Sequence, residues 1–587
     1  MALISDTLAA TVARHGDRPA MHSKHGGRWH TITWREAHTL TRRVAAGFLQ
    51  LGLQPGDGVS ILSANRAEWL LSDLGAILAG GIPVGIYATN SAEQCQYIID
   101  HAECTIAVVE DAAQLAKVLS VRRTLPRLKA IVLMTGTSAE RDVFSWDAML
   151  ALAPRTSQAD LDARIAAQRP DHVCTLIYTS GTTGNPKAVM CTHDNITWTA
   201  WTMGQSVNMD STDCTLSYLP YSHIAEQEAF YALMTAGAST WFAESMDRLG
   251  DNLREVRPTL FFAVPRVWEK IEERMTTAGA ALPPLQRRIG AWARRIGLST
   301  GAADEAGRPR PWLFPLANAL LFSKVRRRLG FDRTRAFFST AAPIARSTLE
   351  YFRSVGIPIG EVYGMSECSG PTTISTPGRS RMGTVGIAMT GSELRIAEDG
   401  EICMRGRHVF KGYFKNPDAS AEMVDADGWL KSGDVGSLDA DGYLTITDRK
   451  KDLLITAGGE NVAPQMIEAH LKSVPVVSQA VVIGDRRKYL VALLTLDPEK
   501  IATTAVEAGS DARDVVAAAT CSAYTAWMQR RVDDVNRGLA RVQTIKRFTI
   551  VPNEFTVDGG ELTPTMKVRR KVINQRYADL IEAMYQE

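Results

Sequence analysis

Short apolar runs alternate with longer stretches of helical periodicity through the first 270 residues of the chain. Because strands that alternate with helices usually form parallel sheets, this region predicts a doubly wound α/β fold. Such sheets bind ligands beyond the carboxyl ends of their strands. The runs that predict buried strands lie at residues 59–62, 105–109, 130–134, 175–178 and 259–263.

The pattern changes between about residues 390 and 447, where the predicted strands shorten and Asp-Gly turns appear. Two near copies, at 425–430 and 439–444, place Trp429 and Tyr443 where a calcium loop would need an oxygen ligand. We therefore expect two hairpin turns in a small β-rich subdomain, not calcium loops.

The last 135 or so residues carry strand and helix signals of their own. Apolar runs at 480–483 and 490–494 and an alanine-rich helical stretch after Lys500 predict a small α+β domain. A charged segment, 448–451, precedes it. The predicted organisation is a large N-terminal domain at 1–447, a hinge at 448–451 and a smaller mobile C-terminal domain at 452–587.

Composition adds several expectations to this picture. A chain of 587 residues exceeds what one hydrophobic core serves, so several folding units are expected. A net charge of +2 does not indicate a nucleic-acid binder. Eight cysteines without a Cys-x-x-Cys pair predict reduced thiols in the cytoplasm and no structural zinc. No signal peptide is visible, and the uncharged stretch 74–92 contains four glycines, which argues against a spanning helix.

One segment is strongly basic, within an insert that we place at about 276–335. Between Gln286 and Arg335 there are 12 Lys and Arg against 3 Asp and Glu, a local charge of +9. Aromatic and aliphatic residues are mixed with these charges. Two interpretations stay open: a solvated helical insert whose apolar residues form a core, or a patch that contacts a membrane surface. The apolar residues concerned are Trp292, Trp312, Leu313, Phe314, Leu320, Leu321 and Phe322.

The most informative stretch is 179–187, which directly follows the predicted strand 175–178. Glycines let backbone N–H groups approach a bulky anion, hydroxyls add donors, and a lysine adds positive charge. The spacing is not that of a Walker A loop. The stretch therefore predicts a loop that grips a polyphosphate, through Thr179, Ser180, Gly181, Thr182, Thr183, Gly184 and Lys187.

Four further polar clusters follow in order, and with this loop they resemble the adenylate-forming enzymes over essentially the whole chain. The clusters are 363–367, 432–434, 448–449 with 458–461, and 564–567 with Arg570. Within that superfamily the chain looks most like long-chain acyl-CoA synthetases of the bubblegum branch. The stretches that carry this closer resemblance are 218–223, 258–270, 455–461 and 559–567.

The resemblance implies two half-reactions with ATP, Mg²⁺, a fatty acid and coenzyme A. A carboxylate attacks the α-phosphorus of ATP, giving acyl-AMP and pyrophosphate, and the thiol of coenzyme A then displaces AMP. It assigns Glu367 to Mg²⁺ and catalysis, and Lys567 to catalysis of adenylation. It assigns nucleotide binding to Tyr363, Gly364, Met365, Ser366, Asp434 and Arg449 besides the loop, with Tyr363 stacking on adenine and Asp434 on the ribose.

The resemblance also implies that the C-terminal domain swings between the two steps about Lys451. The swing would withdraw Lys567 and bring a loop to the coenzyme A side, namely Gly458, Gly459, Glu460 and Asn461. It places His223, Thr340 and Ala341 at the acyl pocket. Thr340 replaces a glycine common there, and Gln227 stands where some long-chain members have a gating tryptophan, so pocket width and chain-length gating do not carry over.

Other functions remain open at this point. A fatty acyl-AMP ligase would pass its product to a carrier protein, and an aryl- or medium-chain acid CoA ligase would use another acid. A protein of a different class, a membrane-docking fatty acid carrier, would not need a polyphosphate loop.

Overall fold

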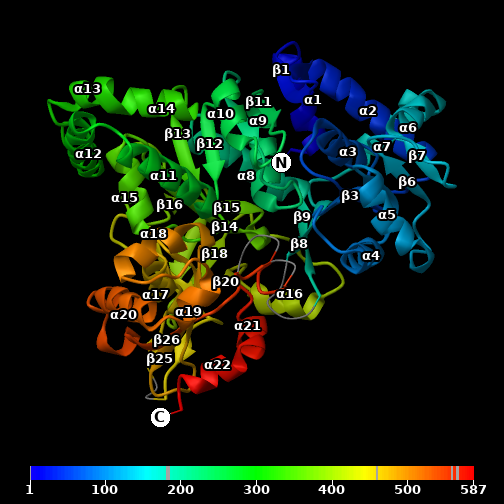
Figure 1. Ribbon diagram of the computed structural model, residues 1–587. Helices are drawn as coiled ribbons and strands as arrows, with labels where there is room; N and C mark the ends of the chain where they lie inside the picture. Colours follow the sequence, from blue (N-terminus) through cyan, green and yellow to red (C-terminus); the bar gives the residue numbers. More distant parts are fainter. Residues whose placement is uncertain (1, 180–184, 458–459, 557–558, 564–567, 587) are drawn as a thin grey trace. The chain divides into compact units, whose positions relative to one another are not determined.

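The computed structural model describes residues 2–179, 185–457, 460–556, 559–563 and 568–586 (Figure 1). The chain divides into two compact units. Unit 1 comprises 1–341, 350–394 and 403–431, and unit 2 comprises 342–349, 395–402 and 432–587.

The largest sheet of unit 1 has eight strands in the order β19-β9-β8-β4-β3-β5-β6-β7. The six strands from β8 to β7 run parallel, and at one edge β9 pairs antiparallel with both β8 and β19. The strands are β3 Gly58–Leu62, β4 Ile82–Ile86, β5 Cys104–Val109, β6 Ala130–Leu133, β7 Val143–Ser145, β8 Val173–Thr179, β9 Lys187–Thr192 and β19 Gly412–Tyr413.

Helices cover both faces of this sheet. Val84 and Ile86 of β4 pack on one face with apolar residues of α4 and α5, while Gly85 between them lies against the ring of Trp69 on α3. This is the alternation expected of a strand. The helices of this region are α1 Ile4–His15, α2 Trp34–Gln50, α3 Ala67–Leu78, α4 Ala92–His101, α5 Ala112–Ser120, α6 Trp146–Leu152 and α7 Gln158–Ala166.

Two further sheets complete the framework of unit 1. The order β12-β13-β14-β15-β16 is parallel over its first three strands (β12 Leu260–Ala263, β13 Ala336–Ser339, β14 Ile359–Met365) and antiparallel after them (β15 Gly370–Ile374, β16 Ile387–Ala388). The order β10-β11-β1-β2 contains β10 Cys214–Ser217, β11 Ser239–Phe242, β1 Pro19–His25 and β2 Arg28–Thr33. The helices α8 His193–Ser206, α9 Ile224–Ala236, α10 Leu249–Val256, α15 Arg346–Ser354 and α16 Pro417–Met423 accompany them.

The predicted fold class is confirmed. Each of the five apolar runs is a strand, and parallel strands form the centre of the two larger sheets. The sequence did not predict the antiparallel pairings, which involve β9, β15, β16 and β19. The uncharged stretch 74–92 spans the end of α3 and β4, and none of the described helices is long and apolar enough to cross a membrane.

Both Asp-Gly copies form turns between antiparallel partners, as predicted. Asp425 Oδ1 accepts from the N–H groups of residues 427 and 429, and Asp439 Oδ1 accepts from those of 441 and 443. The second turn closes the hairpin β20 Leu430–Leu438 and β21 Leu444–Arg449. This hairpin belongs to the sheet β17-β18-β20-β21, with β17 Glu393–Ile396 and β18 Glu401–Arg405.

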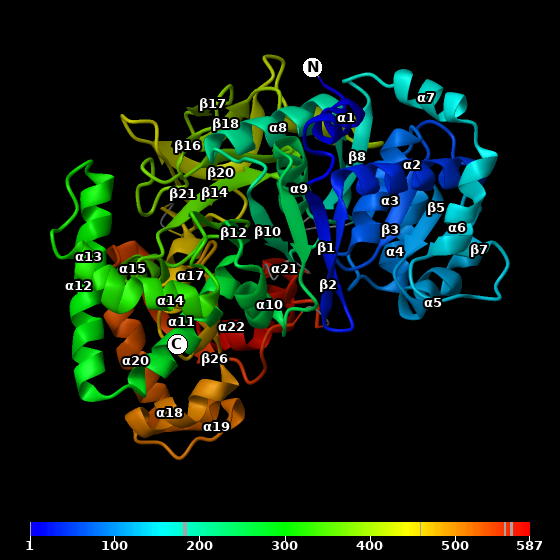
Figure 2. The ribbon, with the colours of Figure 1, turned by 90° about the horizontal axis from the view of Figure 1, so that it is seen from above.

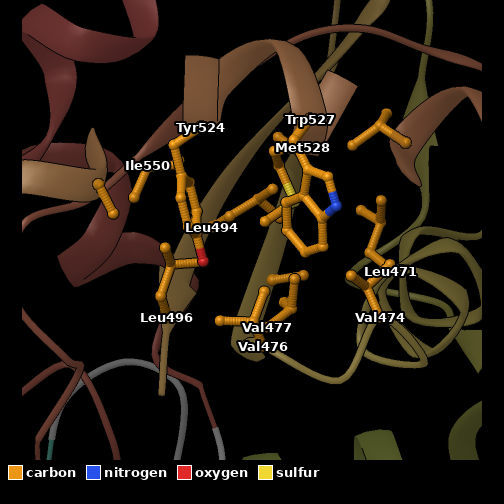
Figure 3. Packing of buried hydrophobic residues seen from close by; sticks show 14 of the residues in the cluster. Leu471, Val474, Val476, Val477, Leu494, Leu496, Tyr524, Trp527, Met528 and Ile550 are labelled. Atoms are coloured by element: carbon orange, nitrogen blue, oxygen red, sulfur yellow. The ribbon is translucent and has the colours of Figure 1, made fainter. Parts of the chain in front are cut away.

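The C-terminal part of unit 2 is the predicted α+β domain. Its sheet β24-β25-β26 carries apolar side chains on both faces. Figure 3 shows Tyr524, Trp527 and Met528 of α20 packed on Leu494 and Leu496. On the other face, Val491 and Leu493 meet α21 and α22. The elements are β22 Leu454–Ile455, β23 Asn461–Val462, α17 Pro464–Leu471, β24 Val477–Ile483, β25 Leu490–Leu496, α18 Pro498–Ala508, α19 Val515–Thr520, α20 Ser522–Asn536, β26 Ile545–Ile550, α21 Arg570–Arg576 and α22 Ala578–Ala583.

The basic insert is helical, and α12 and α13 lie side by side in both views (Figures 1 and 2). A small core of its own holds it together, formed by Trp292, Ala293 and Ile296 on α12 and by Phe314, Ala317, Leu321 and Phe322 on the following helix. The elements are α11 Pro265–Ala280, α12 Pro284–Glu305, α13 Phe314–Ala317, the π-helical turn η3 Asn318–Phe322 and α14 Ser323–Leu329.

Candidate active site

The loop predicted to grip a polyphosphate joins β8 to the antiparallel strand β9. Thr179 is the last residue of β8 and pairs with Lys187, the first residue of β9, and its Oγ1 lies 3.5 Å from the carbonyl oxygen of Lys187. Residues 180–184, which include the predicted contacts Ser180, Gly181, Thr182, Thr183 and Gly184, lie outside the described residues. Because a strand and not a helix follows the loop, any phosphate grip must use the loop's own amides and hydroxyls and not a helix N-terminus.

Lys187 and Glu367 are brought together by a tyrosine that sequence reasoning missed. The Lys187 ammonium lies 4.7 Å from the ring centroid of Tyr413. The Tyr413 hydroxyl donates to Glu367 Oε1 over 2.7 Å. Tyr413 reaches this place because β19 pairs with β9, where Tyr413 lies opposite Val189. No spacing in the sequence indicates a pairing across more than 220 residues, so only the structure could identify this residue.

Glu367 is presented by a tight turn at the end of β14. Tyr363 is buried in the strand, and a backbone irregularity follows it. Gly364 has to be glycine, because a Cβ there would lie 1.9 Å from the carbonyl oxygen of Gly370. Ser366 and Glu367 begin a short 3-10 turn, each 8% exposed, and Met365 N–H donates to the Cys368 sulfur over 3.1 Å.

The electrostatics keep Tyr413 a hydrogen-bond donor. Burial raises the pKa of Tyr413 far above its ordinary value, and the Glu367 carboxylate beside it raises the pKa further. The Glu367 backbone carbonyl also accepts from Phe410 N–H over 2.9 Å, which ties the turn to the segment that carries Tyr413. Among the described residues, Glu367 Oε2 has no hydrogen-bond partner.

Two aromatic residues, Tyr97 and His101, hold the residues that flank the predicted loop, and the sequence did not indicate either of them. Tyr97 on α4 donates to the carbonyl oxygen of Pro186 over 3.3 Å. His101, one turn later, lies with Nδ1 2.7 Å from the hydroxyl of Tyr178 on β8. Both ends of the loop are therefore held to α4 as well as to each other.

Unit 2 brings together two residues predicted to bind the nucleotide, Asp434 at the ribose and Arg449 at the ribose or phosphate. Asp434 on β20 and Arg449 on β21 are cross-strand partners, and Arg449 Nε lies 3.1 Å from Asp434 Oδ1. Asp434 is 5% exposed, and its N–H donates to Ser432 Oγ over 3.0 Å. Arg449 is about half exposed, so the pair offers a buried acceptor with an accessible cation beside it.

The predicted hinge begins where β21 ends, and the residues before Lys451 are firmly held. Asp448 is buried, accepts from the N–H groups of Arg449 (2.6 Å) and Gln465 (3.2 Å), and burial raises its pKa to about 6. Lys450 pairs with Asp399 and Glu401 at 2.6 and 2.8 Å. Lys451 itself is exposed in a turn. This placement does not test hinge motion, so the hinge and the domain limits stay predictions.

The loop predicted for the coenzyme A side connects the short strands β22 and β23. Glu460 is exposed, and its N–H donates to Thr456 Oγ1 over 3.3 Å, while Asn461 begins β23 opposite Ile455. Gly458, Gly459 and Lys567 lie outside the described residues. Arg570, the last member of that polar cluster, makes a partly buried ion pair with Glu468 at 2.7 Å and so holds α21 to α17.

The predicted acyl-pocket residues are placed at two element ends. His223 caps α9, where its Nδ1 accepts from Ala225 N–H over 3.2 Å. Thr340 follows β13, and its N–H donates to the Ala263 carbonyl over 3.1 Å. Ala341 has a φ of +71°, a left-handed conformation that costs a non-glycine residue about 1 kcal/mol or more. Gln227, at the absent tryptophan's position, is buried and donates to Asp73 over 3.0 Å.

Comparison with known proteins decides the family. The AMP-binding enzyme model matches residues 8–414, and the AMP-binding enzyme C-terminal domain matches residues 451–587. The chain belongs to the AMP-binding enzyme family. This confirms the resemblance drawn from the ordered motifs.

Relatives within the AMP-binding enzyme family align over nearly all of this chain. The long-chain-fatty-acid–CoA ligase ACSBG2 of Xenopus laevis is 42% identical over 619 residues, covering 100% of this chain and 84% of that protein. The human ACSBG2 ligase is 39% identical over 614 residues, covering 99% and 92%. The ACSBG1 ligase of Bos taurus is 39% identical over 620 residues, covering 100% and 85%.

Two solved structures share the fold of this chain. An anthranilate CoA ligase, AuaEII, in complex with anthranoyl-AMP superposes with a TM-score of 0.74 at 20% identity, covering 98% of this chain and 97% of that chain. The A domain of carboxylic acid reductase from Segniliparus rugosus gives 0.76 at 20%, covering 99% and 94%. Both confirm the predicted fold class.

Proposed function

We propose that this AMP-binding enzyme is an ATP-dependent long-chain fatty acid:CoA ligase. The observation that carries the proposal is the alignment of nearly the whole chain, at about 40% identity, with ligases named for that reaction. The contacts from Lys187 through Tyr413 to Glu367 support it, because a cation and a carboxylate contact the same tyrosine, and Lys187 is the last residue predicted for the polyphosphate loop.

The first half-reaction needs charge compensation more than covalent help. A carboxylate oxygen of the fatty acid attacks the α-phosphorus of ATP, the bond to the bridging oxygen breaks, and pyrophosphate leaves. Thr179 and Lys187 stand at the two ends of the loop that would hold the leaving phosphates. The ammonium of Lys187 would offset part of their charge.

Glu367 fits the Mg²⁺ that this chemistry uses. One carboxylate oxygen is fixed by Tyr413, and the other has no hydrogen-bond partner among the described residues. Mg²⁺ is usually held by one or two carboxylates together with substrate phosphates, so a single glutamate is a sufficient protein ligand. When bound, Mg²⁺ would neutralise charge on the phosphate oxygens. Tyr413 would keep the glutamate oriented.

The adenosine would be held by Tyr363 against adenine and by Asp434 with Arg449 at the ribose. A buried carboxylate can accept from two hydroxyls at once, and Asp434 is 5% exposed. Gly364, Met365 and Ser366 would line the same nucleotide through the backbone of the turn.

The second half-reaction would follow a swing of the C-terminal domain about Lys451. The thiol of coenzyme A attacks the acyl carbonyl, the bond to the phosphate oxygen breaks, and AMP leaves. Lys567 would act only in the first step, and the loop Gly458–Asn461 only in the second. Lys567→Ala should abolish acyl-AMP formation and leave thioester formation from supplied acyl-AMP largely intact. Equal loss of both steps would contradict this division of labour.

His223, Thr340 and Ala341 would line the acyl pocket. Each methylene changes transition-state binding by only about 1–3 kcal/mol, and Gln227 does not provide a bulky gate. We therefore expect a broad range of chain lengths.

An AMP-release assay over acids from C8 to C22, with ATP and coenzyme A, tests the proposal. Palmitate-dependent AMP release with free coenzyme A is expected, and no release with any of these acids would reject it. Acyl-AMP formation without a free thioester would indicate a carrier-protein acceptor, and preference for benzoate an aryl-acid ligase. Failure to bind ATP would leave only a fatty acid carrier.

We further propose that the enzyme is cytoplasmic and contacts a membrane surface through about residues 286–335. The local charge of +9 suits the anionic face of a bilayer. Long-chain acids partition into bilayers, so this contact would bring the enzyme to its substrate.

A further inference from the structure

The second helix of the insert, 314–329, and the turn just before it carry a stripe of exposed side chains with two different ends. At one end are Trp312, Leu316 and Leu320, which are 85%, 50% and 40% exposed. At the other end are the exposed Lys324 and Arg328. The five follow one another at intervals of four residues.

A four-residue spacing does not normally stay on one side of a helix. An α-helix has 3.6 residues per turn, so each step of four drifts by about 40°. Here the π-helical turn η3, 318–322, lies in the middle of the stripe. A π turn holds more residues than an α turn, so a four-residue step falls short of a full turn and reverses part of the drift. The apolar and basic ends are thereby kept on the same side.

The π turn is held by specific bonds. Ser323 N–H and Ser323 Oγ both donate to the Asn318 carbonyl, the hydroxyl over 2.8 Å. Arg326 donates to Asn318 Oδ1 over 3.0 Å and to the Gly356 carbonyl over 3.4 Å. The inner side chains of the same helix, including Phe322, fill the small core against α12. The outer stripe is therefore a fixed surface and not a frayed end.

The basic residues of the insert divide into those with partners and those without. Arg310 pairs with Asp304 at 2.8 Å, and Arg335 pairs with Asp213 at 2.6 Å. Lys324 and Arg328, in contrast, make no ion pair within the described part of the chain and are exposed. Arg327 is also exposed, and its charge helps to lower the pKa of Asp332. The side chains of all three are accessible to an external anion.

We propose that this stripe docks on an anionic lipid bilayer, with Trp312, Leu316 and Leu320 entering the headgroup–acyl boundary and Lys324, Arg327 and Arg328 binding lipid phosphates. Indole and leucine side chains suit that boundary, and each basic residue near an anionic surface adds affinity. The inference deepens the proposed membrane contact and rests on it. A second copy of the chain is a poor occupant, because it would place like charges against each other.

The apolar and basic ends are separated along the helix. At about 1.5 Å per residue, Leu316 lies about 6 Å from Leu320 and about 18 Å from Arg328 along the helix axis, and Trp312 lies in the turn before the helix. The helix should therefore lie tilted, with the end at Trp312 deepest, and long basic side chains should reach the phosphates from the shallower end.

Co-sedimentation with vesicles of phosphatidylcholine, with or without 30% phosphatidylglycerol, tests the proposal on the full chain. Wild type should bind the anionic vesicles and leave the neutral ones largely unbound. Reversing the charges in Lys324→Glu, Arg327→Glu and Arg328→Glu together should weaken binding about 100-fold or more. A matched triple with the same change in net charge, Arg43→Glu, Arg123→Glu and Lys472→Glu, should lose far less.

The apolar end needs its own variant. Trp312→Ser, Leu316→Ser and Leu320→Ser together should weaken binding about tenfold or more. The matched control replaces three exposed apolar residues elsewhere, Met246, Val506 and Val516 (57%, 81% and 57% exposed), with serine and should bind like wild type. Brominated lipids should quench part of the tryptophan emission in wild type, and Trp312→Phe should remove that part.

Several outcomes would overturn the proposal. They are equal binding to neutral vesicles, unchanged binding of both stripe variants, quenching that survives Trp312→Phe, or a stripe variant that changes the mass in solution from a dimer to a monomer. Sedimentation needs no turnover, so its failure is distinct from failure of the ligase proposal. Activity on octanoate in vesicle-free buffer should be unchanged in both stripe variants.

Discussion

Two tyrosine–carboxylate pairs in unit 1 have nearly the same hydrogen bond and very different surroundings. Tyr413 donates to Glu367 over 2.7 Å, and Tyr231 donates to Asp73 over 2.6 Å. Asp73 is fully buried, and its other oxygen accepts from an amide, that of Gln227. At the first pair, in contrast, the ammonium of Lys187 lies over the tyrosine ring.

The difference shows what separates a site from a packing contact. Burial without a neighbouring cation raises the pKa of Asp73 to about 7, so this carboxyl is partly protonated at neutral pH. Its hydrogen bonds to Tyr231 and Gln227 join packed elements in the protein interior. Glu367 follows the end of β14, with one oxygen held by Tyr413, whose ring contacts Lys187. A short tyrosine–carboxylate bond therefore does not identify a site by itself, and the neighbouring Lys187 ammonium makes the distinction.

Glu367→Gln should have the largest effect. Loss of the negative charge that would balance Mg²⁺ and phosphate should lower the rate of ATP–pyrophosphate exchange by about 100- to 1,000-fold. The melting temperature should stay close to that of wild type, because the Tyr413 bond can be kept by the amide oxygen. Asp73→Asn is the matched control and should keep its exchange rate. Similar rate losses in both variants would erase the proposed distinction.

Asp73→Asn should instead change how stability depends on pH. The pKa of Asp73 is raised from 3.8 to about 7 in the folded state, so between these values the folded protein binds more protons than the unfolded chain. The free energy of unfolding of wild type therefore falls as pH rises through this window and levels off above it. Asp73→Asn has no titrating carboxyl at this position, so its free energy of unfolding should not fall in the same way as pH rises.

Relative to wild type, Asp73→Asn should gain up to about 4 kcal/mol between pH 4 and pH 8. Urea unfolding of both proteins at several pH values measures the difference. A difference that does not vary with pH would show that Asp73 keeps an ordinary pKa.

Removing the hydroxyl of Tyr413 or of Tyr231 should give different effects at the two tyrosine–carboxylate pairs. Tyr413→Phe should lower kcat/KM for ATP about tenfold, by the loss of one hydrogen bond to a charged group, with little change in melting temperature. Tyr231→Phe should do the reverse, costing about 1–3 kcal/mol of unfolding free energy because a buried acceptor loses its donor. Swapped phenotypes would contradict the assignment.

The smallest effect is expected at the foot of the loop. Tyr97→Phe loses the bond to the Pro186 carbonyl, and the KM for ATP should rise about threefold with kcat nearly constant. Tyr489→Phe, which removes a comparable bond to the Met584 carbonyl in unit 2, should leave KM unchanged. Initial-rate kinetics at saturating fatty acid and coenzyme A distinguish the two.

Local patterns in the sequence predicted most of the fold. The apolar run at 175–178 became β8, and Asp425 and Asp439 each accept the two amides of an Asp-Gly turn. These features depend on neighbours a few residues away. The return of the loop along β9 depends on pairing with β8 and β19, and alternation of strand and helix signals carries no information about that partner.

The candidate site was predictable only in part for the same reason. Ordered motifs indicated Glu367 and Lys187, but Tyr413 connects them through a pairing between distant segments. For the basic insert, the sequence supported two interpretations, a small core and an exposed apolar patch. Both are present in the structure, because Phe314 and Phe322 form a core whereas Trp312 and Leu320 are exposed. Only the orientation of the helix shows which apolar residues are buried and which are exposed.

The π turn at 318–322 makes the outer stripe depend on helical phase. Winding the same residues as an ordinary α-helix would rotate all that follows by about 100° about the helix axis. Lys324 and Arg328 would then point away from the side of Leu316, although the amino-acid content of the segment would be the same. A substitution that replaces the π turn by α winding would thus uncouple the two halves of a lipid-binding surface, whereas deletion of one residue within the turn would keep them in phase.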